Sequence, residues 1–156
     1  MRIPTHIMIH HSLTKDGSTV SWPAIEKYHK ETNKWLDIGY HAGIELVTDN
    51  PELDNYKYQA LIGRPLNHMA AACPQRNMNT VALHVCCIGN FDLAPPPQEL
   101  LVTLLKRIIL PWALEFSISA QNWVGHRNYN PNKTCPGTKF NLEALKLLVK
   151  NSGRFI

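Results

Sequence analysis

The chain has 156 residues, of which 44% are hydrophobic and 18% are charged, and its formal net charge at pH 7 is +4. These proportions are typical of a globular protein with one hydrophobic core, so we expect a single domain over residues 1–156. We also expect a monomer, although the sequence does not give the oligomeric state. The lysines and arginines are scattered and form no basic stripe with interleaved aromatics, which argues against a nucleic-acid partner.

The N-terminal residues contain an early proline and no apolar run of the length that a secretory signal needs. The longest apolar region, residues 100–114, is interrupted by Lys106, Arg107 and Pro111 and is too short and too charged to span a bilayer. We therefore expect a protein that is made in the cytoplasm and does not insert into a membrane.

The hydrophobic pattern of the first half predicts strands and one helix. A strand is expected over residues 7–11, followed by a helix that begins at Trp22 and Pro23 and has Ser21 as its N-cap. A turn is predicted at residues 49–51 and a loop over residues 67–79. Further strands are expected over residues 43–47, 56–62 and 81–88. The last of these is nearly continuously apolar, which favours a central strand covered on both faces.

The second half is expected to be mainly helical. The longest helix should follow the prolines at 95–97, and Pro111 is expected to kink or end it. A short strand around Trp123 and Val124 precedes a proline-rich loop over residues 126–137, and Asn141 could cap a last helix. Strands mixed with covering helices predict an α/β fold, a three-layer domain with a central mixed sheet.

Three side chains could bind a metal. His10 ends the first predicted strand, His126 follows the short strand, and Cys135 lies nine positions later. Histidine and cysteine are zinc ligands, and three protein ligands leave a fourth position for water, as in catalytic zinc sites. The spacing alone leaves open the ordinary alternative of a loop histidine and a buried thiol. The four cysteines are expected to be free thiols or metal ligands rather than disulfides.

Five segments appear along the chain in an order that resembles a known family. They are residues 9–12 (Ile-His-His-Ser), 35–41 (Trp-Leu-Asp-Ile-Gly-Tyr-His), 63–65 (Gly-Arg-Pro), 79–91, and 125–127 (Gly-His-Arg) with 133–137 (Lys-Thr-Cys-Pro-Gly). Together they resemble the N-acetylmuramoyl-L-alanine amidases, a family that includes amidase-type bacteriophage lysozymes and animal peptidoglycan recognition proteins. The resemblance covers residues 7–149.

The resemblance implies a set of site residues. Carried over by position, it makes His10 (rather than His11), His126 and Cys135 the ligands of a zinc ion, Tyr40 the active-site tyrosine and Lys133 the catalytic lysine. Taken alone, Tyr40 could be a core aromatic and Lys133 a solvated charge. The implied activity is zinc-dependent hydrolysis of the amide bond between N-acetylmuramic acid and L-alanine in peptidoglycan.

The chain departs from the family pattern in three places. Some relatives have a glutamate as general base on the central strand, where this chain has Cys86, as the phage-lysozyme branch does, so the general base is unnamed. The Gly-x-His of the preceding loop is replaced by residues 70–74, Ala-Ala-Ala-Cys-Pro. His84 occupies a position where glycine is usual.

Several functions remain compatible with the sequence. The complete set of implied site residues favours an enzyme over a recognition module that binds peptidoglycan without cutting it. A structural zinc site would normally have a fourth protein ligand, for which no paired cysteine or histidine is apparent. Between a phage or prophage endolysin and a cytoplasmic amidase that recycles muropeptides, the cysteine at position 86 favours an endolysin, which would act on the cell wall after its release.

Overall fold

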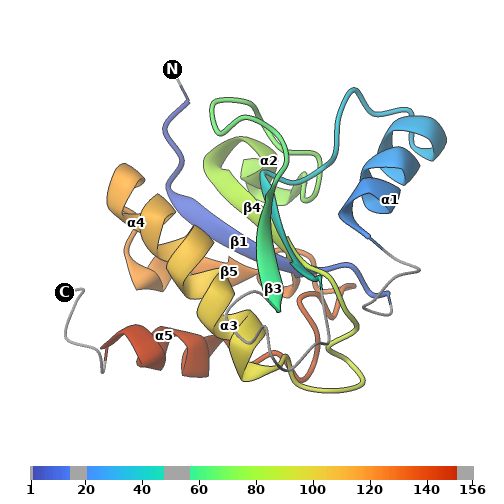
Figure 1. Ribbon diagram of the computed structural model, residues 1–156. Coiled ribbons are helices and arrows are strands. Elements are labelled where there is room, and N and C mark those ends of the chain that lie inside the picture. Colours follow the sequence, from blue (N-terminus) through green and yellow to red (C-terminus); the bar gives the residue numbers. More distant parts are fainter. Residues whose placement is uncertain (1, 15–20, 48–56, 151–156) are drawn as a thin grey trace.

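A five-stranded sheet forms the centre of the molecule in a computed structural model that describes residues 2–14, 21–47 and 57–150 (Figure 1). The strand order is β3-β2-β4-β1-β5; β2 and β3 are antiparallel and the other neighbours are parallel. The predicted mixed sheet is therefore confirmed. The strands are β1 (His6–His11), β2 (Ala42–Leu46), β3 (Tyr58–Ile62), β4 (Ala82–Cys87) and β5 (Trp123–Gly125).

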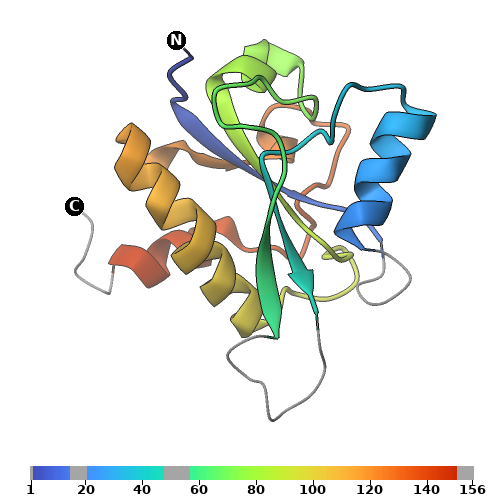
Figure 2. The ribbon, with the colours of Figure 1, turned by 45° about the horizontal axis from the view of Figure 1, so that its top comes forward.

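Helices cover both faces of this sheet, as Figure 2 shows. On one face, α3 (Gln98–Leu104), the π-helical η4 (Leu105–Ile109) and α4 (Leu110–Phe116) follow one another directly, and α5 (Leu142–Lys150) packs into the same core. On the other face lies α1 (Trp22–Lys27), extended by the π-helical η1 (Tyr28–Thr32). The predicted three layers are confirmed. Within the described part of the chain, no helix combines the length and the apolar character needed to cross a bilayer.

The two faces of β4 have different neighbours because side chains alternate along a strand. Leu83, Val85 and Cys87 are fully buried in the core beneath the long helix. His84 and Cys86 point to the opposite face, which α1 and the segments before β4 cover. One face of this strand thus belongs to the main hydrophobic core. The other face carries His84 and Cys86 on the side of the sheet that α1 covers.

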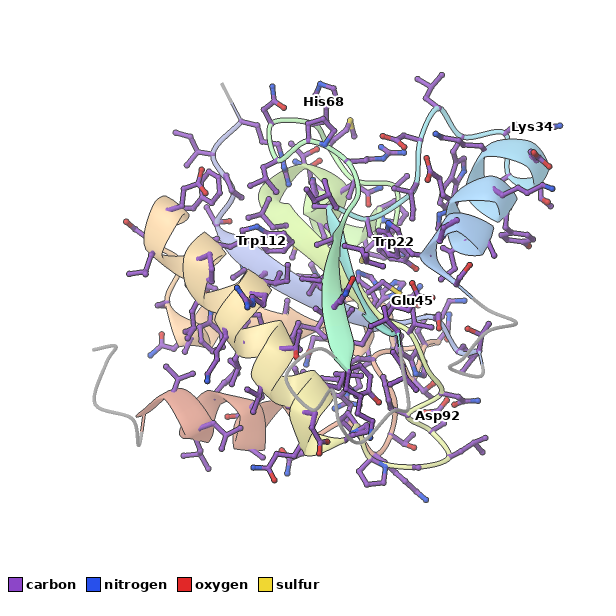
Figure 3. The ribbon with its side chains drawn as sticks, in the orientation of Figure 1. Trp22, Lys34, Glu45, His68, Asp92 and Trp112 are labelled. Carbon is purple, nitrogen blue, oxygen red and sulfur yellow. The ribbon has the colours of Figure 1, made fainter. Side chains whose placement is uncertain are left out.

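Trp22 fixes α1 against the sheet. Ser21 caps this helix with its side chain, as predicted. The Trp22 indole N–H donates to the Ile62 carbonyl at 3.1 Å, and its backbone N–H donates to the Glu45 carboxylate at 3.3 Å. Its ring covers Gly43, where a Cβ would lie 2.3 Å from the ring. Figure 3 shows Trp22 and Glu45 on the α1 side of the sheet, and Trp112 among the helices of the other side.

Two expectations are wrong. The predicted loop over residues 67–79 contains the 3₁₀ turn η3 (Gln75–Asn77) and the beginning of α2 (Met78–Val81), which is too short to show helical periodicity. Pro111 was expected to kink or end the long helix, and the expected end is wrong because the helix continues to Phe116. Pro111 lies directly after the π-helical segment, at the start of α4 within one continuous helix. The turn predicted at residues 49–51 lies outside the described residues.

Candidate metal centre

Two histidines meet at the carboxyl end of adjacent parallel strands. Ile9 of β1 pairs with Gly125 of β5, so the residues that follow them, His10 and His126, lie side by side at the carboxyl end of these strands. Their ring centroids are 4.9 Å apart. Both are buried, with exposed fractions of 2% and 9%. The pairing of β1 with β5 therefore brings together residues that are 116 positions apart in the sequence.

Cys135 reaches the same point from the loop that joins β5 to α5. The Cys135 sulfur accepts the backbone N–H of His11 at 3.4 Å and lies 3.5 Å from His10 Nδ1. The backbone N–H of Arg127 donates to the Cys135 carbonyl at 2.8 Å. Gly137 has a φ of +123° and lies so close to Phe91 that a Cβ would be 2.5 Å from its backbone. These contacts fix the loop and with it the thiol.

Asp92 anchors the same loop from the other side. Its carboxylate accepts the Thr134 hydroxyl at 2.7 Å and the backbone N–H of Thr138 at 2.7 Å. Asp92 is labelled in Figure 3 near the lower edge of the sheet. Hydrogen bonds on both sides of Cys135 thus hold the loop in one position.

The three donor groups fit a zinc ion. The ligand atoms of His10, His126 and Cys135 all lie within 4.8 Å of one another. His126 Nε2 is buried and has no hydrogen-bond partner among the described residues, which is costly unless another group satisfies it. In the protein without a cation, burial raises the pKa of the Cys135 thiol to about 12. A bound cation would favour the thiolate, and two imidazoles with a thiolate suit zinc.

The group remains open on one side. Across residues 2–14, 21–47 and 57–150, no fourth histidine, cysteine or carboxylate joins the three. A cavity of about 270 Å³ lies next to them. An incomplete ligand set beside a cavity is the arrangement of a catalytic zinc site rather than a structural one. The cavity is lined by His10, His11, Ser12, Leu13, Tyr40, Ala72, His126, Lys133, Thr134 and Cys135.

Lys133 is an exposed residue that lines this cavity. Burial lowers the pKa of His126, and the positive charge of Lys133 lowers it further. The same charge works against burial at the Cys135 thiol and lowers its pKa. Lys133 is therefore close enough to the metal-binding group to influence its electrostatics.

Tyr40 lines the cavity on the side of β2. The backbone N–H of Gly39 donates to His29 Nδ1 at 3.1 Å, which holds the segment before β2. The ring centroid of Tyr40 is 5.2 Å from that of His10. Burial, and then the neighbouring Cys86 thiol, raises the pKa of the Tyr40 hydroxyl well above its ordinary value. This hydroxyl therefore keeps its proton and can donate it in a hydrogen bond.

His11 lies on the other face of β1. Its Nδ1 accepts the backbone N–H of Phe91 at 3.2 Å, and its ring stacks on Phe91 with 6.1 Å between centroids. The structure brings His10, and not His11, to His126 and Cys135.

The sequence did not explain His84, which the structure places beside His10. His84 Nδ1 is 2.9 Å from His10 Nε2, and its own Nε2 is 3.0 Å from the Met78 carbonyl. The alternation of side chains along β4 indicates only that His84 and Cys86 share a face of the strand. The contact itself depends on the register of β1 against β4, in which His10 pairs with Cys86.

Residues 1–138 match the model of a family described as N-acetylmuramoyl-L-alanine amidase, and the chain belongs to this family. No curated protein sequence matches the chain. Family membership narrows the function to cutting or recognising peptidoglycan.

Solved structures of under 25% identity share the fold. The amidase LysC of Clostridium intestinale URNW has a TM-score of 0.75 and 23% identity, over 96% of this chain and 87% of that one. A Drosophila PGRP-LB mutant in complex with tracheal cytotoxin has a TM-score of 0.70 and 23% identity, over 92% and 80%. The endolysin of the Thermus scotoductus bacteriophage Ph2119 has a TM-score of 0.68 and 22% identity, over 86% and 77%.

Proposed function

We propose that the chain is a zinc-dependent amidase that hydrolyses the bond between N-acetylmuramic acid and L-alanine in peptidoglycan. The observation that carries this proposal is the open group of His10, His126 and Cys135 beside a cavity, with the His126 nitrogen unpaired. These three side chains would hold the zinc ion. Zinc bound there would supply a Lewis acid and lower the pKa of a coordinated water toward ~7.

Lys133 and Tyr40 can stabilise the charge that develops during this reaction. Hydrolysis forms a bond from the water oxygen to the carbonyl carbon and breaks the carbon–nitrogen bond, so negative charge accumulates on the carbonyl oxygen. Lys133 and Tyr40 both line the cavity, and the Tyr40 hydroxyl keeps its proton, so these two side chains are the candidate donors for this oxygen. The departing amine takes up a proton, for which Tyr40, Lys133 and water are the available sources.

A recognition module that binds peptidoglycan without cutting it is the second candidate. It is supported by the likeness to peptidoglycan recognition proteins, among them Drosophila PGRP-SD at a TM-score of 0.68 and 19% identity. Binding alone requires the cavity but does not require the two buried histidines and the thiol next to it. We therefore favour the enzyme.

The biological setting that we propose is that of a phage or prophage endolysin, which reaches the cell wall after its release from the cytoplasm and acts as a monomer. The likeness to two Clostridium intestinale amidases and to a bacteriophage endolysin supports this setting over a muropeptide-recycling amidase. Sedimentation of the purified protein tests the monomer. Addition to permeabilised bacteria tests the endolysin: falling turbidity supports it, whereas cleavage limited to soluble muropeptides supports the recycling enzyme.

The central experiment incubates the zinc-loaded protein with purified peptidoglycan and identifies the products by mass spectrometry. Free stem peptides that begin with L-alanine are expected, and they should be absent with the variant Cys135→Ala. The matched control is Cys87→Ala, which removes a buried thiol from the face of the sheet that packs against the long helix and should keep the activity. Binding without cleavage would favour the recognition module, and cleavage of a sugar linkage would contradict the proposed reaction.

A further inference from the structure

His84 is a fully buried histidine whose two ring nitrogens both have partners. Its Nε2 lies 3.0 Å from the Met78 carbonyl oxygen, which can only accept a hydrogen bond, so this nitrogen must carry a hydrogen. In a neutral imidazole the other nitrogen is then an acceptor. His84 Nδ1 therefore offers its lone pair to His10 Nε2, 2.9 Å away.

This acceptor determines which nitrogen of His10 carries the hydrogen. His10 Nε2 donates to His84, so His10 Nδ1 has a free lone pair. His10 Nδ1 is the atom that lies 3.5 Å from the Cys135 sulfur, on the side where the candidate metal ligands converge. The chain of hydrogen bonds runs from His10 through His84 to the Met78 carbonyl and leaves the metal-facing nitrogen unprotonated.

The backbone of His84 is held as firmly as its ring. Its N–H donates to His41 Nδ1 at 2.9 Å, and its carbonyl accepts the His41 backbone N–H at 2.9 Å. His41 Nε2 in turn lies 2.9 Å from the His68 carbonyl, to which it donates. His41 and Met78 thus fix His84 from two different segments, so its Nδ1 is held in place for His10.

We propose that His84 is a positioning residue for the metal centre: it fixes the ring and the tautomer of His10 so that Nδ1 is presented to zinc. A metal-binding histidine usually donates its other N–H to a carboxylate, a carbonyl or water, and losing that partner typically costs 10- to 100-fold in metal affinity. In this chain the acceptor of that N–H is a second histidine, His84. His84 acts through His10 and makes no contact with the substrate cavity.

The tautomer can be measured without any metal. In the metal-free wild-type protein, long-range proton–nitrogen NMR of the histidine rings at pH 7.5 should show His10 with its hydrogen on Nε2 and His84 with its hydrogen on Nε2. A hydrogen on His10 Nδ1 would overturn the proposal. This measurement needs no variant, so it is independent of any effect of substitution on folding.

Two substitutions then test the effect on zinc. His84→Leu removes the acceptor and fills similar space, and we expect the zinc dissociation constant, measured by competition with a chromophoric chelator, to rise by about 10- to 100-fold. His84→Asn places a side-chain oxygen near the position of Nδ1 and should recover most of that loss. Equal zinc affinity in the wild-type protein and in His84→Leu would overturn the proposal.

Val85→Ala is the matched control, because Val85 is equally buried on the same strand but faces the long helix. It should destabilise the fold and leave the zinc dissociation constant unchanged. If it weakens zinc as much as His84→Leu does, loss of packing explains the effect and the proposal is wrong.

The inference rests on the proposed function, and the two can fail separately. A wild-type protein that binds no zinc would contradict both. A wild-type protein that binds zinc and releases stem peptides, while His84→Leu matches it in zinc affinity, would contradict only the role of His84.

Discussion

The two faces of the central sheet are built in different ways. Toward the long helix, Leu83, Val85 and Cys87 of β4 pack among apolar side chains, which need close contact but no particular direction. Toward the metal centre, His84 makes directional hydrogen bonds to His10 and to the Met78 carbonyl. One face therefore supplies most of the stability, and the other holds functional groups in position.

This difference implies that the two faces can be disrupted separately. None of the three candidate metal ligands belongs to the apolar cluster beneath the long helix. A substitution in that cluster should lower the stability of the fold without altering the metal centre. A change at the metal centre should alter zinc binding or activity and leave the fold intact.

Removal of the metal is the change with the largest expected effect on activity. Chelation should abolish turnover and leave the folded structure intact, because the core does not depend on the ligands. The unfolding free energy should fall only by the contribution of binding, about 4 kcal/mol at a free-metal concentration a thousand times the dissociation constant. Turnover and circular dichroism before and after chelation, with zinc added back as the control, measure both. Loss of the folded spectrum would contradict the separation of the two faces.

The reverse disruption is Leu104→Ala. Leu104 belongs to the long helix and is 0% exposed, and truncation should lower the unfolding free energy by about 2–5 kcal/mol. Zinc affinity should not change. Leu114→Ala is the control on the same helix, since Leu114 is 64% exposed and its loss should cost less than about 0.5 kcal/mol. Denaturant unfolding and chelator competition give the two values, and weaker zinc binding in Leu104→Ala would show that the faces are coupled.

Lys133→Ala tests a group that belongs to the cavity without being a metal ligand. Turnover should fall by about 10²–10³-fold, the typical effect of removing one oxyanion donor. Zinc affinity and stability should change little, because Lys133 is exposed. Lys106→Ala, an exposed lysine on the helix of the other face, should be fully active. Undiminished turnover in Lys133→Ala would refute its role.

The sequence predicted the mixed sheet and its covering helices because alternation and apolar runs are local signals. It did not reveal α2, whose four residues are too few for a periodic pattern, or the continuation of the long helix beyond Pro111. A proline inside a helix usually ends or kinks it, and the π-helical segment that directly precedes Pro111 leaves no clear pattern in the sequence.

The candidate site could be predicted only in part. His10, His126 and Cys135 were expected from the family resemblance, whereas their spacing left other interpretations open. The hydrogen bonding of His84 to His10 could not be predicted, because it depends on the register of β1 against β4 and on the Met78 carbonyl of α2. Register is a property of the folded sheet, and Met78 was itself expected to lie in a loop.

His41 lies behind His84 on the polar face and should make the stability of the metal-free protein depend on pH. Burial lowers the pKa of His41 from 6.5 to about 4; its hydrogen bond to the His68 carbonyl raises it, and the charges of Arg2 and Arg64 lower it. The unfolded chain therefore binds a proton below pH 6.5 that the folded protein does not take up until about pH 4. As far as His41 is concerned, the unfolding free energy is therefore highest above pH 6.5, and it falls as the pH falls toward 4.

The effect of His41 on stability is the smallest of the four effects predicted here. One pKa unit corresponds to about 1.4 kcal/mol, so His41 should account for about 2 kcal/mol of the stability lost between pH 6.5 and 5. Other buried histidines contribute as well, and the variant His41→Gln, which cannot titrate, isolates this share. Its unfolding free energy, measured by denaturant at each pH, should fall less steeply than that of the wild-type protein. Parallel pH profiles would mean that His41 takes up its proton at the same pH in the folded and the unfolded protein, and the hydrogen bond from the His84 N–H to its Nδ1 would then be wrong.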